Sequence, residues 1–364
     1  MIEAPITGLP EGGSERGALA AALAIDDPRA RDTLFEAAYD VKRRHVGTVV
    51  YLRGLVELSN VCAKDCLYCG IRRSNGAVAR YTMSDEEILA AAARADRRGL
   101  GSLVLQSGEL QGEEFARRIE RLLRSICAET GGRLGITLSL GEQSAATYRR
   151  WFEAGAHRYL LRIETSNAAL YRHLHPAGHD FEKRLRCLRD LKETGYQVGT
   201  GVMIGLPGQT PEDLADDVLF MKARDVDMVG MGPYIPHAGT PLAREAAGLD
   251  PAAALALGLR MIAVVRIVLK DVNIAATTAL EALDPRGREL GLRAGANVVM
   301  PNLTPPAYRD AYRLYDGKPC RDDPYDEADA FSGTVRSFGE TIGWARWGDA
   351  PHFRKRRERE EAAA

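Results

Sequence analysis

Eight short runs of apolar and β-branched residues alternate with longer segments of helical periodicity along most of this chain. The runs cover roughly residues 49–57, 102–106, 134–140, 158–163, 197–204, 228–231, 273–277 and 297–300. Such alternation is typical of βα units around a parallel sheet. Eight strands with crossover helices predict an α/β fold, a closed or nearly closed (β/α)8 TIM-type barrel. Catalytic groups in such a barrel lie at the carboxyl ends of the strands.

The segments outside these runs suggest three regions. We expect an N-terminal helical extension over residues 1–48, the barrel over 49–320, and a C-terminal helical extension with a charged tail over 321–364. The run Arg354-Lys355-Arg356-Arg357-Glu358-Arg359 is expected to be a solvated tail. Ser84 followed by Glu87 predicts a capping box at the start of one helix.

Composition indicates a globular protein with no strong preference for a charged partner. The formal net charge is −1 and 45% of the residues are hydrophobic, so neither nucleic acid nor a membrane surface is favoured as a partner. We expect no signal peptide and no stretch approaching the ~20 apolar residues of a membrane span. The default location is therefore the cytoplasm, where a tight cysteine cluster indicates metal binding or catalysis rather than disulfides.

Three of the six cysteines, Cys62, Cys66 and Cys69, form a C-x3-C-x2-C pattern directly after the first predicted strand. Three thiolates can hold three irons of a 4Fe-4S cluster and leave the fourth iron open, whereas electron-carrying clusters normally have four cysteines. A structural zinc site completed by a histidine is the alternative. None of the seven histidines lies in this loop, and structural zinc sites usually show paired ligand knuckles. Cys127 and Cys187 lie in helical patterns and are expected to be small buried apolar residues.

Polar residues follow several other predicted strands. Ser107 and Glu142 fit ligand contacts and ordinary turn chemistry equally well. Arg162 and Glu164 share one face of the fourth strand, either as a structural ion pair or as a pair that grips a ligand. Alternating glycines near Met203 in the fifth run would let a flat ring approach the backbone.

The last two strands also end in polar groups. Thr277 and Thr278 follow the seventh run, and Met300 and Asn302 end the eighth, with Tyr308 shortly after. A threonine pair is often explained by β-propensity alone. At this rim of a barrel, however, hydroxyls with an asparagine and a tyrosine could hold a small polar or anionic substrate.

The cysteine pattern, with Tyr68 before the third cysteine, resembles the radical S-adenosylmethionine (SAM) superfamily. Within it the chain looks like the biotin-synthase-like branch and, more specifically, the HydE family of FeFe-hydrogenase maturases. The resemblance is carried by eight blocks in order, at residues 57–73, 104–109, 137–142, 158–164, 205–210, 227–237, 275–278 and 295–302.

This resemblance implies a cluster whose open iron chelates SAM and reduces it to methionine and a 5′-deoxyadenosyl radical. It implies that SAM lies near Tyr68, Gln106, Ser139, Arg162, Glu164, Arg184 and Met203, and a substrate near Thr277, Thr278, Met300 and Tyr308. The implied substrate is an organometallic small molecule, an iron synthon bearing cysteine, two carbon monoxides and a cyanide, attacked by the radical at the cysteine sulfur. Implied partners are a reductant such as a ferredoxin or flavodoxin and other hydrogenase maturases.

Some members of the family carry a second cluster near the C-terminus, bound by three cysteines. Here only Cys320 remains in that region, so we expect no second cluster. A methylornithine synthase or another biotin-synthase-like enzyme is the nearest alternative function, and residues 277–278 and 300–302 favour the maturase over it. A non-catalytic metal-binding scaffold is a more remote one.

Overall fold

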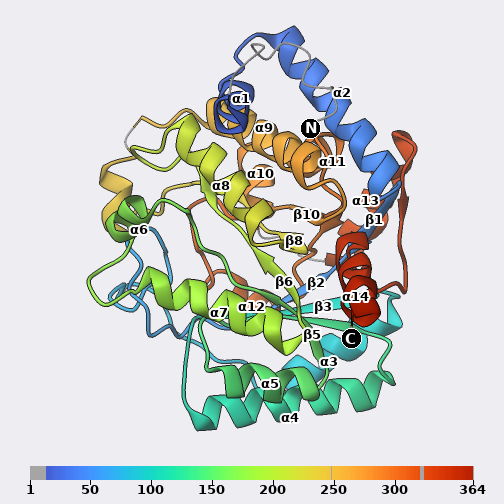
Figure 1. The fold of residues 1–364 in the computed structure, drawn as a ribbon. Helices are drawn as coiled ribbons and strands as arrows, with labels where there is room; N and C mark the ends of the chain where they lie inside the picture. Colours follow the sequence, from blue (N-terminus) through green and yellow to red (C-terminus); the bar gives the residue numbers. More distant parts are fainter. Residues whose placement is uncertain (1–13, 247, 320–323, 364) are drawn as a thin grey trace.

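A computed structural model describes residues 14–246, 248–319 and 324–363 of the protein. Ten strands of the described residues form one sheet in which every pair is parallel (Figure 1). In sheet order they are β12 (Thr341–Ile342), β1 (Val49–Leu52), β11 (Val298–Val299), β10 (Asn273–Ala276), β8 (Met228–Val229), β6 (Gln197–Thr200), β5 (Ala156–Leu160), β4 (Gly135–Ser139), β3 (Ser102–Ser107) and β2 (Gly54–Ser59).

The two ends of the sheet meet because the first predicted strand is used twice. The run breaks at Arg53, so that β1 pairs with β11 and β12 while β2 pairs with β3. The amide of Arg53 donates to the carbonyl of Val299 at 2.9 Å, and the amide of Leu55 donates to that of Pro301 at 2.8 Å. The predicted TIM-type α/β fold is therefore confirmed, with its closure made by one continuous stretch of chain.

Two other predicted strands are each divided. The runs at 197–204 and 228–231 form β6 and β8 and then separate, and β7 (Met203–Ile204) pairs with β9 (Gly232–Pro233) as a second small sheet. The backbones cross closely at this point, since a Cβ on Gly201 would lie 1.9 Å from the carbonyl oxygen of Gly230. A glycine is required at such an approach.

Helices surround the sheet (Figure 1). They are α1 (Glu15–Leu23), α2 (Pro28–His45), α3 (Asp85–Arg97), α4 (Glu113–Thr130), α5 (Ala145–Glu153), α6 (Ala168–Leu174), α7 (Phe181–Thr194), α8 (Pro211–Ala223), η1 (Pro241–Arg244), α9 (Pro251–Leu269), α10 (Thr278–Leu283), α11 (Gly287–Arg293), α12 (Pro306–Arg309), α13 (Pro324–Ser337) and α14 (Pro351–Ala363). The capping box predicted at Ser84 and Glu87 is present at the start of α3.

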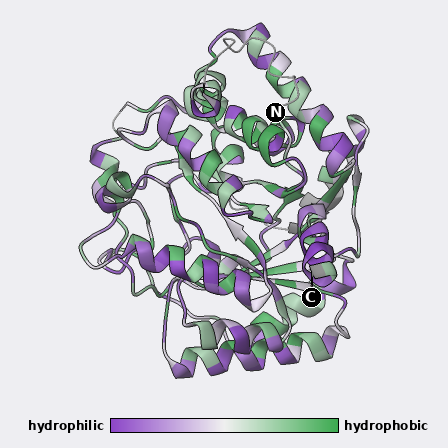
Figure 2. Ribbon diagram, in the orientation of Figure 1, coloured by the Kyte–Doolittle hydropathy of each residue, from purple (hydrophilic) through white to green (hydrophobic). Residues whose placement is uncertain are grey.

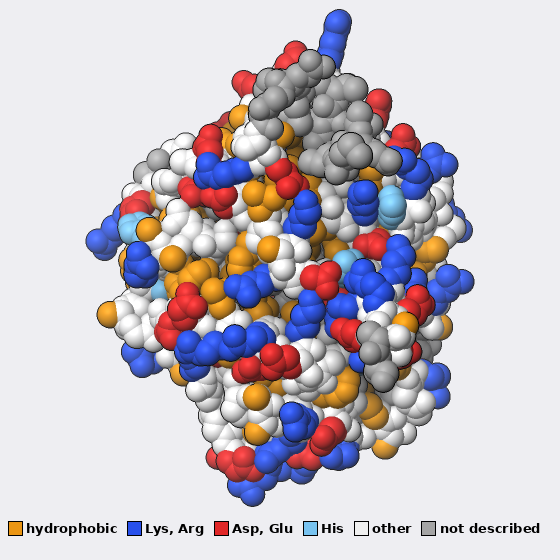
Figure 3. Space-filling view, viewed as in Figure 1, with side chains coloured by type: hydrophobic (Ala, Val, Ile, Leu, Met, Phe, Trp, Pro, Cys, Tyr) orange, Lys and Arg blue, Asp and Glu red, His pale blue; other side chains and the backbone are white. Residues whose placement is uncertain are grey.

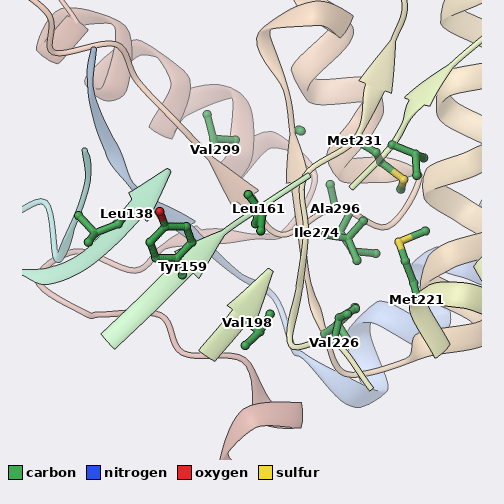
Figure 4. Packing of buried hydrophobic residues seen from close by; sticks show 14 of the residues in the cluster. Leu138, Tyr159, Leu161, Val198, Met221, Val226, Met231, Ile274, Ala296 and Val299 are labelled. Carbon is green, nitrogen blue, oxygen red and sulfur yellow. The ribbon is translucent and has the colours of Figure 1, made fainter. Parts of the chain in front are cut away.

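Alternate strand residues separate two environments. Leu138 of β4, Tyr159 of β5 and Val198 of β6 belong to the buried apolar cluster shared with the helices (Figure 4). Their strand neighbours face the barrel interior, where Glu57 and Gln106 are examples that line a cavity. Polar groups therefore lie among apolar residues inside the barrel, while the apolar core lies between strands and helices.

Helix α9 corrects one expectation from the sequence. The helix has 19 residues, and the mean hydropathy of its most apolar 18-residue window is 2.1, enough by length and composition to cross a membrane. Half of it is buried inside the protein, and it contacts α1, α2 and α8. Figure 2 shows it as one of the most hydrophobic helices. Packing against other helices accounts for this composition, because a helix apolar on most sides is typical of a buried position.

A C-terminal segment fills the amino-terminal end of the barrel. The buried Arg158 guanidinium donates to the Asp349 carboxylate and to the carbonyl of Trp347, both at 2.8 Å. Arg53 donates to the carbonyl of Gly348 at 3.1 Å. Burial lowers the pKa of Arg158 to about 10, although Asp349 partly offsets this effect. This end of the barrel is thus closed by hydrogen-bonded charged groups.

The charged run near the C-terminus lies in helix α14. The expectation that the whole run is solvated is wrong for Arg356. Arg356 is 3% exposed. Its guanidinium donates to the carboxylate of Asp227 at 2.9 Å and to the carbonyl of Tyr196 at 3.0 Å. The surrounding surface in Figure 3 carries Lys, Arg, Asp and Glu side chains interspersed with one another.

Candidate active site

A cavity of about 320 Å³ opens at the carboxyl ends of the strands. Its lining includes all three clustered cysteines and most of the other predicted site residues: Tyr68, Gln106, Ser139, Arg162, Glu164, Arg184, Met203, Thr277, Thr278 and Met300. Residues from seven different strand ends thus converge on one space, as expected for a parallel barrel.

The three cysteines are largely withdrawn from solvent. Burial raises the pKa of the Cys66 thiol to about 12, and it also raises the pKa values of Cys62 and Cys69. Thiols in such a site become thiolates only beside a strong positive charge such as a metal ion. The backbone amide of Glu109 donates to Cys62 Sγ at 3.3 Å, a contact typical of iron-sulfur sites. This donor set fits a cluster bound through three cysteines.

Two histidines approach the cysteine loop from the chain between α6 and α7. A ligand atom of each of His175 and His179 lies within 4.8 Å of Cys66 Sγ and of the other. The Nδ1 atom of His175 is 2.7 Å from the carbonyl oxygen of Tyr171. Although the cysteine loop contains no histidine, two histidines therefore lie next to it in the structure. The spacing of residues in the sequence did not indicate that they lie close to Cys66.

Behind the cysteines lies a buried network of charges. Arg184 donates to Glu142 at 2.7 Å and to the carbonyl of Arg162 at 2.7 Å, while Lys64 pairs with Glu142 at 3.0 Å and with Glu109 at 3.3 Å. Burial alone would raise the pKa of Glu142, but Arg184 and Lys64 lower it to about 2. For Glu109 burial prevails and the pKa is raised. Glu142 thus has a clear structural role as the anchor of Arg184.

Arg162 and Glu164 form the ion pair that their spacing allowed, with Nη2 and Oε2 2.9 Å apart. Arg162 also donates to the carbonyl of Val202 at 2.8 Å. Glu164 has a φ of +64°, which is unusual for a residue with a side chain. In this conformation its carbonyl accepts from the amide of Met203 at 2.9 Å. The pair is held at the point where β6 gives way to β7.

Another part of the cavity lining contains several hydroxyl groups. Thr278 Oγ1 and Tyr315 Oη are 2.9 Å apart, and Gln106 donates to the hydroxyl of Tyr312 at 3.2 Å. Thr277 Oγ1 donates to the carbonyl of Met231 at 3.3 Å. All five of the named polar side chains line the cavity, so this part can accept a polar ligand.

Tyr308 was expected near the substrate, but the structure does not bring it to the cavity; Asn302, expected beside it, is likewise absent from the lining and donates to Glu57 instead. The Tyr308 ring stacks on Tyr81 with centroids 4.7 Å apart. Its hydroxyl donates to the carboxylate of Glu87 at 2.8 Å, on α3 outside the barrel. Tyr312 and Tyr315, four and seven residues later, contribute the phenols instead.

Residues 311–318 form a strap across the mouth of the barrel. The carbonyl of Leu314 accepts from the amide of Gly70 at 2.9 Å, and the amide of Asp316 donates to Pro236 at 3.1 Å. The carbonyl of Ala311 accepts from Asn60 at 2.6 Å. The strap therefore joins loops that follow β2 and β9. Cys320 comes shortly after the strap and lies outside the described residues. The expectation of no second cluster near Cys320 therefore stays a prediction.

Comparison with known proteins gives consistent matches. Residues 56–221 match the model of the Radical SAM superfamily. The [FeFe] hydrogenase maturase subunit HydE of Thermotoga maritima is 49% identical over 84% of this chain and 85% of its own. The 3-methylornithine synthase of Methanosarcina acetivorans is 30% identical over 82% of each chain. The crystal structure of methylornithine synthase (PylB) superposes with a TM-score of 0.78 at 26% identity, covering 92% of this chain and 96% of that one.

Proposed function

Because the chain belongs to the radical SAM superfamily and, within it, to the family of the HydE maturase, we propose that it acts on a cysteine-bound iron dicarbonyl cyanide synthon. Its class as a radical SAM enzyme of the hydrogenase maturase type follows from the 49% identity across most of the chain. The observation that carries the finer proposal is the single cavity that joins the three cysteines to a hydroxyl-lined pocket.

We assign the cluster to Cys62, Cys66 and Cys69, and SAM to the neighbouring lining residues Tyr68, Gln106, Ser139, Arg162, Glu164, Arg184 and Met203. When bound, one 4Fe-4S cluster would supply the electron that cleaves SAM, giving the 5′-deoxyadenosyl radical that attacks the synthon's cysteine sulfur. Arg162 offers a planar donor fork and Glu164 an acceptor for hydroxyl or ammonium groups. Their mutual contact would orient both toward the ligand.

The substrate would occupy the hydroxyl-lined part of the cavity near Thr277, Thr278 and Met300. Tyr315 belongs to the strap and is hydrogen-bonded to Thr278 there. Its phenol can therefore connect the strap to a ligand through hydrogen bonds. The strap lies over this part and would keep water from the reacting atoms, which is a general requirement of radical chemistry in enzymes.

A methylornithine synthase is the second candidate. It is supported by 30% identity over 82% of the chain and by the close superposition with PylB. The higher identity to HydE favours the maturase. Under either function we expect a soluble reductant such as a ferredoxin or flavodoxin, and a place in the cytoplasm. Under the maturase function we also propose contact with other hydrogenase maturases and no second cluster.

The test is reductive cleavage of SAM by the anaerobically reconstituted, dithionite-reduced enzyme, measured as methionine formation, because a radical that bonds to the cysteine sulfur ends in an S-adenosyl product and not in 5′-deoxyadenosine. Reactions would contain the synthon, L-lysine as an isomer of 3-methylornithine, or neither. Strong stimulation by the synthon alone supports the proposal. Stimulation by L-lysine alone would favour the second candidate. No stimulation by the synthon, in enzyme with a full cluster, would refute the proposed substrate.

A further inference from the structure

The cavity contains a buried ion pair that the assignments above do not use. Glu57 lies two residues before the end of β2, and Lys318 is the last residue of the strap. Their side chains are 1% and 5% exposed, and Lys318 Nζ contacts Glu57 Oε1. Both residues line the cavity. The pair therefore places one positive and one negative charge side by side inside the barrel.

Neighbouring groups hold each member of the pair in position. The second carboxylate oxygen of Glu57 accepts from Asn302 Nδ2 at 3.1 Å and from Thr304 Oγ1 at 3.4 Å. Lys318 Nζ donates to the carbonyl of Tyr312 at 2.8 Å and lies 4.9 Å from the centre of its ring. An ammonium has three donors, and the described residues supply these two acceptors for it. The pair is thus preorganised by its neighbours.

The other charged residues in the cavity lining belong to a different group. Lys64, Glu109, Arg162, Glu164 and Arg184 are joined by ion pairs or hydrogen bonds beside the cysteines. In the hydroxyl-lined part, Glu57 and Lys318 are the charged residues of the described lining, and the ion pair between Arg288 and Glu281 lies behind Tyr315.

Stability alone is a weak reason for such a pair. Removing two charges from water costs several kcal/mol per ion, and apolar residues of similar volume often stabilise a protein equally well. Binding of a ligand that carries both charges would explain why the pair is present. An α-amino acid has an ammonium and a carboxylate on one carbon, so adjacent opposite charges in the protein match it.

We propose that Glu57 binds the ammonium, and Lys318 the carboxylate, of an α-amino-acid group in the substrate. The inference rests on the proposed function in taking this cavity as the substrate site. It adds the class of group recognised, and it applies equally to a synthon that carries cysteine and to an amino acid such as 3-methylornithine. On binding, the contact between Lys318 and Glu57 is exchanged for two contacts with the ligand.

The test uses the cluster-loaded enzyme with SAM bound and three thioether probes. S-methyl-L-cysteine carries both charges, S-methylcysteamine lacks the carboxylate, and 3-(methylthio)propanoate lacks the ammonium. Isothermal titration should give the wild-type enzyme at least tenfold tighter binding of the amino acid than of either analogue. Lys318→Met should lose the preference over S-methylcysteamine, and Glu57→Gln the preference over 3-(methylthio)propanoate.

Lys42→Met is the matched control. Lys42 pairs with Glu340 at 2.5 Å and both side chains are fully buried, but neither residue lines the cavity. This variant should keep both preferences. A wild-type enzyme without preference for the amino acid overturns the inference, and this result does not depend on how any variant folds. Retained preferences in folded, cluster-loaded Lys318→Met and Glu57→Gln also overturn it.

The synthon assay separates this inference from the proposed function. If the wild-type enzyme prefers the amino-acid probe but the synthon does not stimulate SAM cleavage, the substrate proposal fails and the recognition of an amino-acid group stands. If the synthon stimulates turnover and the probes show no preference, the substrate proposal stands and Glu57 and Lys318 have another role.

Discussion

Replacement of Asp349 by asparagine tests the account of how the barrel is closed at its amino-terminal end. The carboxylate accepts from the buried Arg158 at 2.8 Å and lies 3.1 Å from His157 Nε2. Burial alone would raise the pKa of Asp349, but His157 and Arg158 lower it to about 2. The side chain is 23% exposed, so solvent screens these interactions only in part.

Two estimates bound the cost from below and from above. A pKa lowered from 3.8 to about 2 corresponds to about 2 kcal/mol of stability. This contribution is fully present above pH 3.8 and is lost as the pH falls through about 2. Breaking a buried ion pair typically costs about 3–5 kcal/mol. Arg158 would keep its bonds to Thr137 and Trp347, so we expect Asp349→Asn to lower the free energy of unfolding by about 2–4 kcal/mol at pH 7.

The assay is urea unfolding of the anaerobic holoenzyme, followed by far-UV circular dichroism. Asp216→Asn is the control, because Asp216 pairs with Arg16 on the surface, where the side chains are 42% and 47% exposed. Such pairs contribute about 1 kcal/mol or less. If the two variants unfold at the same urea concentration with the same slope, the buried network does not close the barrel as described.

Three further predictions follow from the site and from helix α14. Cys66→Ser should abolish cluster binding and turnover while Cys187→Ser preserves both, which iron analysis and methionine-formation assays would measure; cluster loss in the second variant contradicts the ligand set. Thr277→Val should still bind SAM but lose at least tenfold in synthon-dependent turnover, and an equal loss of SAM affinity would move this residue to the cofactor site. The pKa of His352 is raised by its bond to Asp271, so its stabilisation is full below pH 6.5 and lost as pH rises through the folded value. Wild-type urea midpoints should therefore fall over that range relative to His352→Gln, and parallel pH profiles would contradict this.

Much of the site could be predicted because parallel strands bring their carboxyl ends together. Cys62, Gln106, Arg162 and Thr277 follow different strands, and each lines the same cavity. Their roles rest on the resemblance, but their proximity follows from the strand pattern. Where a strand is followed at once by a polar residue, the sequence position alone indicates the place in the barrel.

Residues beyond the last strand could not be placed in this way. No strand pattern fixes the positions of residues 308–318. The sequence therefore indicates a tyrosine near the substrate but does not distinguish Tyr308 from Tyr312 and Tyr315, which line the cavity. The same limit applies to His175 and His179, which reach Cys66 from a connection between helices.

The expectation that the charged C-terminal run is solvated fails for a different reason. Arg356 lies in a sequence that is typical of solvent-exposed chain, but its partner Asp227 is 129 residues away. Such distant pairing leaves no local signal. The break between β6 and β7 is similar, since the close approach of Gly201 and Gly230 becomes apparent only in three dimensions.

The double use of the first barrel strand has a consequence for the order of events during biosynthesis. Strand β1 pairs with β11 and β12, which are made after the other strands of the sheet, whereas the loop carrying Cys62, Cys66 and Cys69 follows β2, the second strand to be made. The sheet cannot close on the ribosome until its last strands emerge. The nascent chain therefore carries its three thiols for most of its synthesis before the barrel that buries them exists.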